Sequence, residues 1–246
     1  PKLHNFWIKK YNIKATYEKV KLEKDKIKNI INEVKKNKIN GINVTVPFKK
    51  DVIPYLDEMT DVAKQTQSVN TIFKVNNKIV GENTDVYGFS EAIKLSNFDP
   101  KNKKVLILGA GGVSPSIILA LKKMGVSAIS LTNRTRQKAE HLKIFFPFIK
   151  IIDWGEAVKS DLIVNATSIG IKTNDEIKLD LSKLGGQLFY DVIYNPSQTN
   201  FLSKAKKLGK KIENGKNMFI YQAFKAFKIW HNVDPEVNNH VRDLIK

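Results

Sequence analysis

Cysteine is absent from the 246 residues of this chain, which excludes disulfides, thiolate catalysis and cysteine-bound metal. The four histidines are scattered, with no pair at the helical spacing of metal ligands, so we expect no metal site. No apolar run approaches the roughly 18 residues that a membrane-spanning helix needs, and the first residues lack the pattern of a signal peptide. We therefore expect a cytoplasmic protein that does not contact membranes.

Arginine is scarce as well. Arg134, Arg136 and Arg242 are the only arginines, and almost all of the net charge of +18 comes from lysines spread along the chain. Because arginine is the residue favoured for recognising phosphates and bases, this make-up argues against a nucleic-acid partner. A basic nucleic-acid-binding protein stays as the alternative from another functional class, and it would bind nonspecific DNA in a salt-dependent manner.

The first part of the chain alternates predicted helices and strands. Proline is favourable in the first turn of a helix, and apolar residues recur at helical spacing between residues 27 and 34. The pair Asn76-Asn77 between two short apolar runs is typical of a hairpin turn. We predict helices at 1–11, 27–34 and 48–56, and strands at 17–20, 41–46, 69–73 and 78–80.

The pattern becomes more regular after Lys103. An apolar run at 105–108 meets a glycine turn at 109–112, and a helical segment follows at 114–124. Such alternation predicts a doubly wound parallel sheet with right-handed crossovers. We predict further strands at 128–132, 149–152, 162–165 and 188–192, further helices at 137–146 and 200–208, and only helix at 218–230 and 235–245.

The glycine turn lies between a predicted strand and a predicted helix, where a backbone can approach a pyrophosphate at the helix N-terminus. Ser114 stands where the usual G-x-G-x-x-G pattern has its third glycine, so a glycine turn without a nucleotide stays as an alternative. The candidate cofactor-binding residues of this turn are Gly109, Ala110, Gly111, Gly112 and Val113.

The end of the next predicted strand indicates which dinucleotide would bind. An NAD-binding protein places Asp or Glu there, about 20 residues after the glycines, to bind the ribose hydroxyls. Here the residues are Asn133, Arg134 and Thr135, followed by Lys138. An acid would repel a 2′-phosphate, whereas the guanidinium of Arg134 can bind one in bidentate fashion. We therefore expect NADP rather than NAD, with a solvated arginine beyond a strand as the alternative.

Polar side chains mark the ends of two predicted strands in the first part of the chain. Asn43 and Thr45 point the same way along an apolar strand, and Lys49 lies just past its end. Asp85 follows a second apolar strand and precedes a helix. Strand ends of this kind bind ligands in α/β sheets. Taken alone, Lys49 would be a surface lysine and Asp85 a helix N-cap.

Short motifs occur along the whole chain, at 43–49 (NVTVPFK), 68–71 (SVNT), 83–88 (NTDVYG), 109–112 (GAGG), 133–135 (NRT), 165–170 (NATSIG), 191–196 (DVIYNP) and 218–222 (MFIYQ). They resemble the motifs of the shikimate dehydrogenases, in that family's order. The resemblance implies NADP-dependent, reversible reduction of 3-dehydroshikimate to shikimate in aromatic amino acid biosynthesis. A related enzyme that accepts quinate, with NAD or NADP, is the nearest alternative.

The resemblance also implies an α/β fold with two domains. One is a substrate domain at 1–86 and 219–246, discontinuous and lacking its first strand. The other is a Rossmann-type, doubly wound NADP domain at 87–218, and the C-terminal helices return to the substrate domain. The chain begins at the proline of the family's Ser-x-Ser-Pro segment, whose serines bind the substrate carboxylate, so we expect impaired substrate binding in the chain as given. We expect a monomer or homodimer.

Roles of individual residues also follow from the resemblance. Lys49 and Asp85 match the family's catalytic pair, and Tyr194 matches the residue that reaches the carboxylate end of shikimate. The residues that match its groups for hydrogen-bonding the ring hydroxyls are Thr45, Asn70, Asp85 and Gln222.

Three further positions match cofactor contacts of the family. Val192 and Gly215 correspond to positions beside the nicotinamide, and Asp61 corresponds to a weaker cofactor-associated position. Two departures stand out, namely Pro115 after Ser114, where the family usually has arginine, and Asn217, where a glycine commonly precedes the methionine. Proline is sterically compatible with the first turn of a helix, whereas Asn217 would alter the loop near the nicotinamide.

Overall fold

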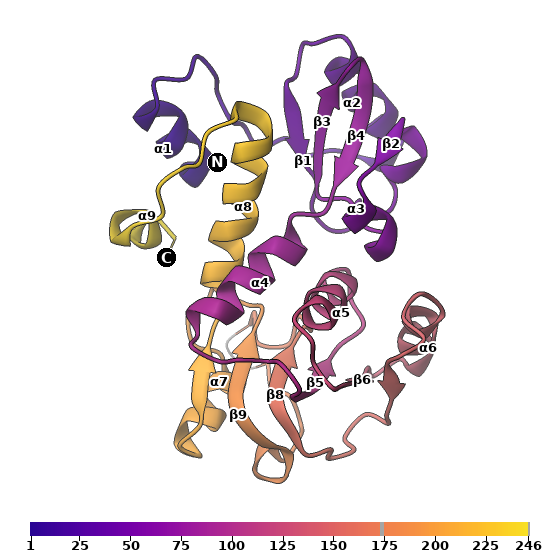
Figure 1. Cartoon of the computed structure of the whole chain (residues 1–246), viewed down its shortest axis with the longest axis vertical. Coiled ribbons are helices and arrows are strands. Elements are labelled where there is room, and N and C mark those ends of the chain that lie inside the picture. The colour runs from indigo at the N-terminus through magenta and orange to yellow at the C-terminus, as the bar shows by residue number, and fades with distance from the viewer. Residues whose placement is uncertain (173–174, 246) are drawn as a thin grey trace. The chain divides into compact units, whose positions relative to one another are not determined.

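The computed structural model describes residues 1–172 and 175–245. The chain divides into two compact units, one formed by Pro1–Gly88 with Ile220–Ile245 and the other by Phe89–Phe219. The boundaries fall inside two helices, α4 (Asp85–Leu95) and α8 (Lys216–His231). Each unit has a sheet of its own (Figure 1).

Among the described residues, the sheet of the first unit has four strands in the order β1-β3-β4-β2. The β3–β4 hairpin closes through Asn76 and Asn77, whose positive φ angles of 48° and 63° are those that a two-residue hairpin turn requires. The predicted hairpin is therefore confirmed. Within this sheet, β2 and β4 pair in parallel, whereas β1 with β3 and β3 with β4 pair antiparallel. The strands are β1 (Gly41–Asn43), β2 (Glu58–Met59), β3 (Thr71–Val75) and β4 (Lys78–Glu82).

The helix α2 (Ile27–Lys35) packs on this sheet through an apolar stripe and follows a short 3₁₀ helix, η1 (Lys24–Lys26). Ile27, Ile31 and Val34 form one buried cluster with apolar side chains of β3 and β4. Their spacing of three and four residues is the one that the sequence predicted. The helix α3 (Asp61–Thr66) begins after Thr60, whose hydroxyl accepts a hydrogen bond from the backbone N–H of Ala63 and caps the helix.

Two elements predicted in the N-terminal part of the first unit are absent from the structure. Residues 17–20 form no strand, because the backbone of Tyr17 is bound to Asn5 of α1 (Lys2–Lys10) through two hydrogen bonds of 2.8 Å. The segment 48–56 consists of turns and a short 3₁₀ helix, η2 (Ile53–Tyr55), rather than an α-helix. Proline in this segment lacks the N–H that a longer helix would need.

The C-terminal helices pack against the start of the chain, as the resemblance implies. The rings of Phe227 in α8 and Trp7 in α1 lie 5.4 Å apart, and Trp7 is fully buried. The indole N–H of Trp7 also donates to the carbonyl of Glu236 at 3.1 Å. Residues more than 200 positions apart in the sequence thus form one core in the first unit.

The last helix, α9 (Asn239–Asp243), is shorter than the predicted segment 235–245. Its start is set by Asn238, whose side-chain oxygen accepts from the backbone N–H of Val241 at 3.0 Å. Just before this cap, the backbone N–H of Glu236 donates to the hydroxyl of Tyr11 at 2.8 Å. These contacts hold the segment before Asn238 in an extended, non-helical path.

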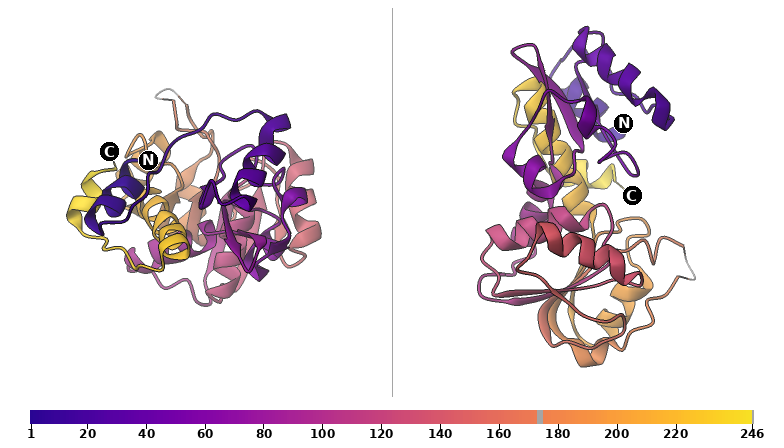
Figure 2. Two further views of the ribbon diagram at one scale, coloured as in Figure 1. Left: turned by 90° about the horizontal axis from the view of Figure 1, so that it is seen from above. Right: turned by 90° about the vertical axis from the view of Figure 1, so that its right-hand side faces the viewer.

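In the part of the chain that the structure describes, the second unit has a sheet of six strands in the order β10-β9-β8-β5-β6-β7, and every neighbouring pair is parallel. The chain runs outward from β5 through α5 and α6 to β7, and then through β8, β9 and α7 to β10 (Figures 1 and 2). This is the predicted doubly wound arrangement. The elements are β5 (Lys104–Leu108), α5 (Ser114–Lys123), β6 (Ala128–Thr132), α6 (Arg136–Phe145), β7 (Lys150–Ile151), β8 (Ser160–Asn165), η3 (Leu181–Leu184), β9 (Gly185–Asp191), α7 (Asn200–Lys207) and β10 (Lys211–Glu213).

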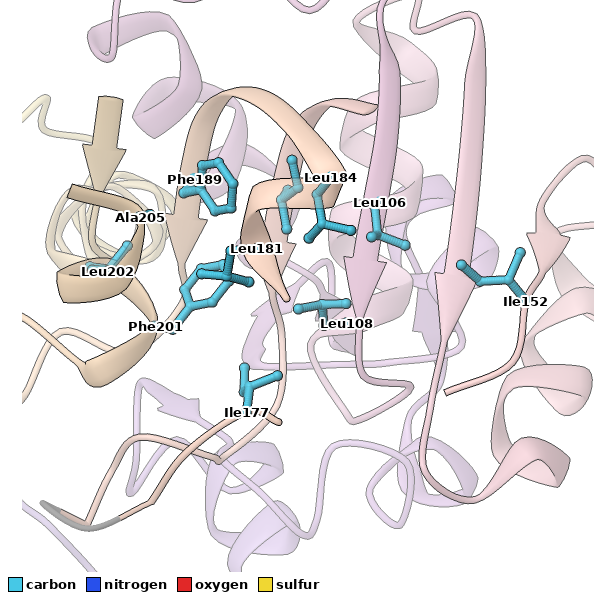
Figure 3. Packing of buried hydrophobic residues seen from close by; sticks show 11 residues of the cluster. Leu106, Leu108, Ile152, Ile177, Leu181, Leu184, Phe189, Phe201, Leu202 and Ala205 are labelled. Atoms are coloured by element: carbon cyan, nitrogen blue, oxygen red, sulfur yellow. The ribbon is translucent and has the colours of Figure 1, made fainter. Parts of the chain in front are cut away.

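Helices cover both faces of this sheet. Successive residues of a strand point to opposite faces, so neighbouring residues pack against different helices. In β9, Phe189 packs against Phe201 of α7, with ring centroids 5.7 Å apart. The next residue, Tyr190, packs edge-on against Phe89 of α4 at 5.2 Å. Figure 3 shows the cluster on the α7 side, to which Leu106 of β5 also belongs. Burial of each such side chain stabilises the fold by about 1.5–3 kcal/mol.

Two classes of feature are missing from residues 1–172 and 175–245. No helix there is long and apolar enough to cross a lipid bilayer. Nor do three or more His, Asp or Glu side chains come together there in a way that could hold a metal ion.

Candidate active site and cofactor site

Lys49 and Asp85 form an ion pair in the first unit. Lys49 lies in the turns that follow β1, and Asp85 is the first residue of α4. The Nζ atom of Lys49 is 2.6 Å from Oδ2 of Asp85, and the two side chains are only 13% and 9% exposed. Because the pair is shielded from water, its attraction is stronger than that of a surface ion pair. The sequence prediction placed both residues at strand ends, and the structure brings them together.

Asn70 holds the second carboxylate oxygen of Asp85. Its Nδ2 donates to Oδ1 of Asp85 at 2.9 Å, and its own Oδ1 accepts from the backbone N–H of Thr84 at 2.8 Å. A backbone N–H can only donate, so this contact fixes which way the amide of Asn70 points. Both oxygens of Asp85 are thus oriented by the protein alone, one by Lys49 and one by Asn70.

Backbone contacts explain why these distant residues meet. The backbone N–H of Val69 donates to the carbonyl of Lys49 at 2.9 Å, which joins the turns after β1 to the start of β3. The backbone N–H of Asp85 donates to Oδ1 of Asn83 at 3.1 Å, and Nδ2 of Asn83 donates to the carbonyl of Ser68 at 3.0 Å. The start of α4 is therefore tied to the same strand end. Asp85 also places its negative charge at a helix N-terminus, which is stabilising.

The other predicted substrate-binding residues belong to both units. Thr45 is exposed in the segment just before Lys49, and Gln222 lies half-buried on α8; both belong to the first unit. Tyr194 belongs to the second unit, where its ring packs against that of Phe219 with centroids 4.7 Å apart. Asn70 contacts the Lys49–Asp85 pair directly, through its hydrogen bond to Oδ1 of Asp85.

The glycine turn of the second unit follows β5 closely. Gly109 has a φ of 108°, and a methyl group there would lie 3.0 Å or less from atoms of residues 166 and 167, so glycine is required. The backbone N–H of Ala110 donates to Oδ1 of Asn133 at 3.0 Å, and that of Gly111 donates to the hydroxyl of Ser114 at 3.0 Å. The structure therefore brings Asn133, from the end of β6, into direct contact with the glycine turn.

Two amides of this turn have no partner within the described residues. They are the backbone N–H groups of Gly112 and Val113, at the start of α5. Unpaired N–H groups at a helix N-terminus favour an anion such as phosphate. This is the geometry that a pyrophosphate-binding turn needs.

Arg134 and Arg136 lie two residues apart but differ in their surroundings. Arg136 is bound to two carboxylates, those of Asp153 and Glu140, the latter at 3.1 Å. Arg134 is exposed and makes no hydrogen bond or ion pair with the residues that the structure describes. Thr135 and Lys138 beside it are exposed as well. Of the two arginines, only Arg134 has a guanidinium that is available to an anionic ligand.

Val192 and Gly215 lie against each other in the second unit. A methyl group at Gly215 would lie 2.0 Å from the carbonyl oxygen of Val192, so the two backbones approach as closely as glycine permits. The backbone N–H of Gly215 donates to the carbonyl of Ile193 at 3.1 Å. Asp61, in contrast, belongs to the first unit, where its side chain is 90% exposed beside Lys64 in α3.

Asp191 anchors the segment that carries Val192 and Tyr194. Its carboxylate is fully buried and accepts hydrogen bonds from the hydroxyl of Thr199 at 2.6 Å, the backbone N–H of Ile193 at 3.0 Å and the amide of Asn165 at 3.1 Å. Burial raises the pKa of Asp191, and these three hydrogen bonds oppose the rise. Asp191, Thr199 and Asn165 had no predicted role, although Asn165 and Asp191 are the first residues of two motifs that resemble those of the family.

We expect Asp191→Asn to change how stability depends on pH. A carboxyl whose pKa is raised by folding contributes most to the free energy of unfolding below its unfolded pKa, and this contribution declines as the pH rises through the folded pKa. Asparagine keeps the shape of the side chain but does not titrate. In urea unfolding from about pH 4 to 7, the wild-type chain should lose stability relative to the variant as the pH rises. If the difference in free energy of unfolding between the two chains were the same at every pH, the prediction would be wrong. The control is Asp153→Asn, which removes a carboxylate that is 77% exposed.

Comparisons with known proteins match both parts of the chain to shikimate dehydrogenases. The family described as Shikimate dehydrogenase substrate binding domain matches residues 1–72, and the family described as Shikimate / quinate 5-dehydrogenase matches residues 91–172. The shikimate dehydrogenase (NADP(+)) of Pelagibacter ubique is 55% identical over 246 residues, which cover 100% of this chain and 93% of that protein.

Solved structures are similar over the same length. The shikimate dehydrogenase of Aquifex aeolicus matches with a TM-score of 0.90 and 36% identity, covering 99% of this chain and 90% of that one. The shikimate 5-dehydrogenase of Thermus thermophilus, solved in complex with NADP(H) and shikimate, matches with a TM-score of 0.90 and 28% identity, covering 100% and 92%.

The doubly wound sheet with a glycine turn after its first strand is that of dinucleotide-dependent oxidoreductases, and a shielded lysine–aspartate pair is suited to the proton transfer that such enzymes carry out. The matches over the full chain narrow this class to one family. The chain belongs to the shikimate dehydrogenase family. The predicted family and fold class are therefore confirmed.

Proposed function

We propose that this chain catalyses the reversible, NADP-dependent reduction of 3-dehydroshikimate to shikimate, a step of aromatic amino acid biosynthesis. The observation that carries the proposal is the Lys49–Asp85 pair, with a separation of 2.6 Å and side chains no more than 13% exposed. The names of the relatives, shikimate dehydrogenase (NADP(+)), support both the substrate and the cofactor. A basic nucleic-acid-binding function has no comparable support.

Lys49 is the acid–base group of this proposal. NADP supplies the hydride chemistry when it is bound. In the direction of reduction, the ammonium of Lys49 stabilises the negative charge that develops on the carbonyl oxygen and delivers a proton to it. In the direction of oxidation, neutral Lys49 accepts the hydroxyl proton. Asp85 orients the Nζ atom in both directions, because Asn70 holds its carboxylate in place.

The groups proposed to hydrogen-bond the substrate's ring hydroxyls are those of Thr45, Asn70, Asp85 and Gln222, and Tyr194 is the residue proposed to reach its carboxylate end. Asn70 illustrates how such a group can discriminate. Its Oδ1 accepts from the backbone N–H of Thr84, and one N–H of its Nδ2 donates to Asp85, which leaves the second N–H for a substrate hydroxyl. A ring without that hydroxyl would leave a polar group unpaired, at a cost of about 1–3 kcal/mol.

The residues of the second unit fit NADP. The unpaired N–H groups of Gly112 and Val113 are donors for the pyrophosphate, with Gly109, Ala110 and Gly111 shaping the turn. Arg134 binds the 2′-phosphate, and the neighbouring residues of this subsite are Asn133, Thr135 and Lys138. Val192 and Gly215 line the nicotinamide side, and Asp61 is the weakest of the assigned cofactor positions.

The two units of the fold then have separate tasks. Residues 1–86 and 219–246 make up the substrate domain, and residues 87–218 make up the NADP domain. Support comes from the family match described as a substrate binding domain, which covers residues 1–72. A cytoplasmic location, a monomeric or homodimeric state and a preference for shikimate over quinate complete the proposal.

Initial rates of NADPH formation test the activity. With the full-length protein, we expect turnover of shikimate with NADP+, and slower turnover when quinate replaces shikimate or NAD+ replaces NADP+. Absorbance of the reduced nicotinamide gives the rate directly. If shikimate does not drive NADP+ reduction, the proposed function is wrong; if quinate with NAD+ is the better pair, the alternative enzyme is right.

We expect Arg134→Ala to weaken NADP+ binding roughly 10- to 100-fold, because a charge-assisted hydrogen bond to phosphate contributes about 1.5–3 kcal/mol. Affinity for NAD+, which has no 2′-phosphate, should not change. Arg136→Ala is the matched control, since the guanidinium of Arg136 is already bound to Asp153 and Glu140. Calorimetric titration of both variants with both cofactors gives four dissociation constants, each of which is compared with that of the wild-type chain. An equal loss for NADP+ and NAD+ would contradict the assignment of Arg134.

A further inference from the structure

Ser114 spans the glycine turn with its side chain. It is the first residue of α5 and is fully buried. Its hydroxyl donates to the carbonyl of Gly109 at 2.8 Å and accepts from the backbone N–H of Gly111 at 3.0 Å. One side chain thus ties the first and third residues of the turn together, and both hydrogen-bonding functions of the hydroxyl are used.

The hydrogen bonds of the turn divide its amides into two sets. The N–H of Gly109 donates to the carbonyl of Thr132 at 2.7 Å, and the N–H groups of Ala110 and Gly111 donate to side chains. Only the adjacent N–H groups of Gly112 and Val113 are without a partner among the described residues. The contact with Ser114 therefore withdraws Gly111 from ligand binding and leaves a pair of donors beside it.

We propose that Ser114 is a positioning residue for the cofactor's pyrophosphate. It holds the glycine turn, before any ligand arrives, in the conformation that keeps the N–H groups of Gly112 and Val113 available. The inference rests on the proposed NADP-dependent function and deepens it. A turn held in this way does not have to be ordered when the cofactor binds, which lowers the entropic cost of binding.

This position explains how the chain replaces the missing third glycine. In the usual pattern that glycine allows the helix to pack closely on the strand. Here a serine fits with no exposure to solvent, and it adds hydrogen bonds that glycine could not make. Pro115 directly after it has no N–H of its own, so it adds no competing donor to the first turn of α5.

We expect Ser114→Ala, which removes both hydrogen bonds of the hydroxyl, to weaken NADP+ binding about 3- to 10-fold, which corresponds to about 0.5–1.5 kcal/mol. Binding of 2′-AMP, which carries the 2′-phosphate but no pyrophosphate, should be unchanged. Calorimetric titration of the apo chain measures both affinities without relying on turnover. The preference for NADP+ over NAD+ should also be unchanged, because Arg134 is intact.

Ser96→Ala is the matched control. Ser96 is also a buried serine of the second unit, and its hydroxyl donates to the carbonyl of Ile93 at 2.7 Å in α4, not to the glycine turn. It should bind NADP+ as the wild-type chain does. If Ser114→Ala binds NADP+ as tightly as the wild-type chain, or loses 2′-AMP and NADP+ equally, Ser114 does not position the pyrophosphate. If the wild-type chain itself binds neither ligand, the proposed function fails first and this inference with it.

Discussion

The Lys49→Ala variant is expected to lose about 10²- to 10⁴-fold in kcat, the contribution of a positioned acid–base group. The Nζ atom of Lys49 is held 2.6 Å from Asp85, and the side chains of the pair are largely shielded from water. Alanine removes both the proton donor and the positive charge that faces the developing alkoxide. Steady-state rates with shikimate and NADP+ measure the loss, and binding of NADP+ should be unchanged because Lys49 is not among the proposed cofactor contacts.

Two further variants separate proton transfer from simple charge pairing. Lys49→Arg keeps a positive charge opposite Asp85, but a guanidinium does not lose its proton in the accessible pH range, so turnover should stay low while stability recovers. Lys50→Ala removes the neighbouring lysine, which is exposed, and should behave as wild type. If Lys49→Arg turned over at the wild-type rate, Lys49 would have an electrostatic role only. Urea unfolding of the three variants shows whether Lys49→Ala, in which Asp85 has lost its partner, is less stable than the other two.

The pairing of Lys49 and Asp85 shows what sequence reasoning can achieve. Each residue followed an apolar strand, and strand ends are where α/β sheets bind ligands, so a site near both was predictable. The choice of Lys49 among so many lysines came from the family resemblance. The structure adds what neither argument contained, namely that Asn70 orients the second oxygen of Asp85.

Local signals with a strong backbone preference were predicted well. Asn76 and Asn77 gave the hairpin, because asparagine tolerates the positive φ angles that the turn needs. The apolar strands of the parallel sheet were found because burial on both faces requires continuous apolar runs. The short strand Lys211–Glu213 was missed, since it has a single apolar residue and exists only through its pairing with β9.

Errors arose where a distant contact overrides a local preference. The segment at 17–20 looked like a strand, but its backbone is occupied by Asn5, twelve residues before Tyr17. Ser114 was seen only as a departure from a glycine pattern, because the role of its hydroxyl depends on how the turn folds back. Asp191 had no assigned role for the same reason, since two of its three partners lie eight or more residues away.

Gly215→Ala is expected to lower the free energy of unfolding by about 1–3 kcal/mol, the usual cost of overpacking a closely packed site. The added methyl group would lie 2.0 Å from the carbonyl oxygen and 2.5 Å from the carbonyl carbon of Val192. Both are backbone atoms, so no side-chain rotation can relieve the overlap. The N–H of Gly215 is bound to Ile193 and its carbonyl to Phe219, which limits how far Gly215 itself can move.

The same substitution should also reduce NADP-dependent turnover, because relief of the overlap requires Val192 to move, and Val192 lines the nicotinamide side in the proposed function. Gly111→Ala is the control for stability. Its methyl group would meet only the carbonyl oxygen of Ala166, at an ordinary contact distance of 3.7 Å, so the unfolding of the apo chain should change little. Urea unfolding of the two variants without cofactor compares them directly. If the two variants were equally stable, the backbone around Val192 would move at little cost. The expected loss of turnover in Gly215→Ala would then have no steric explanation.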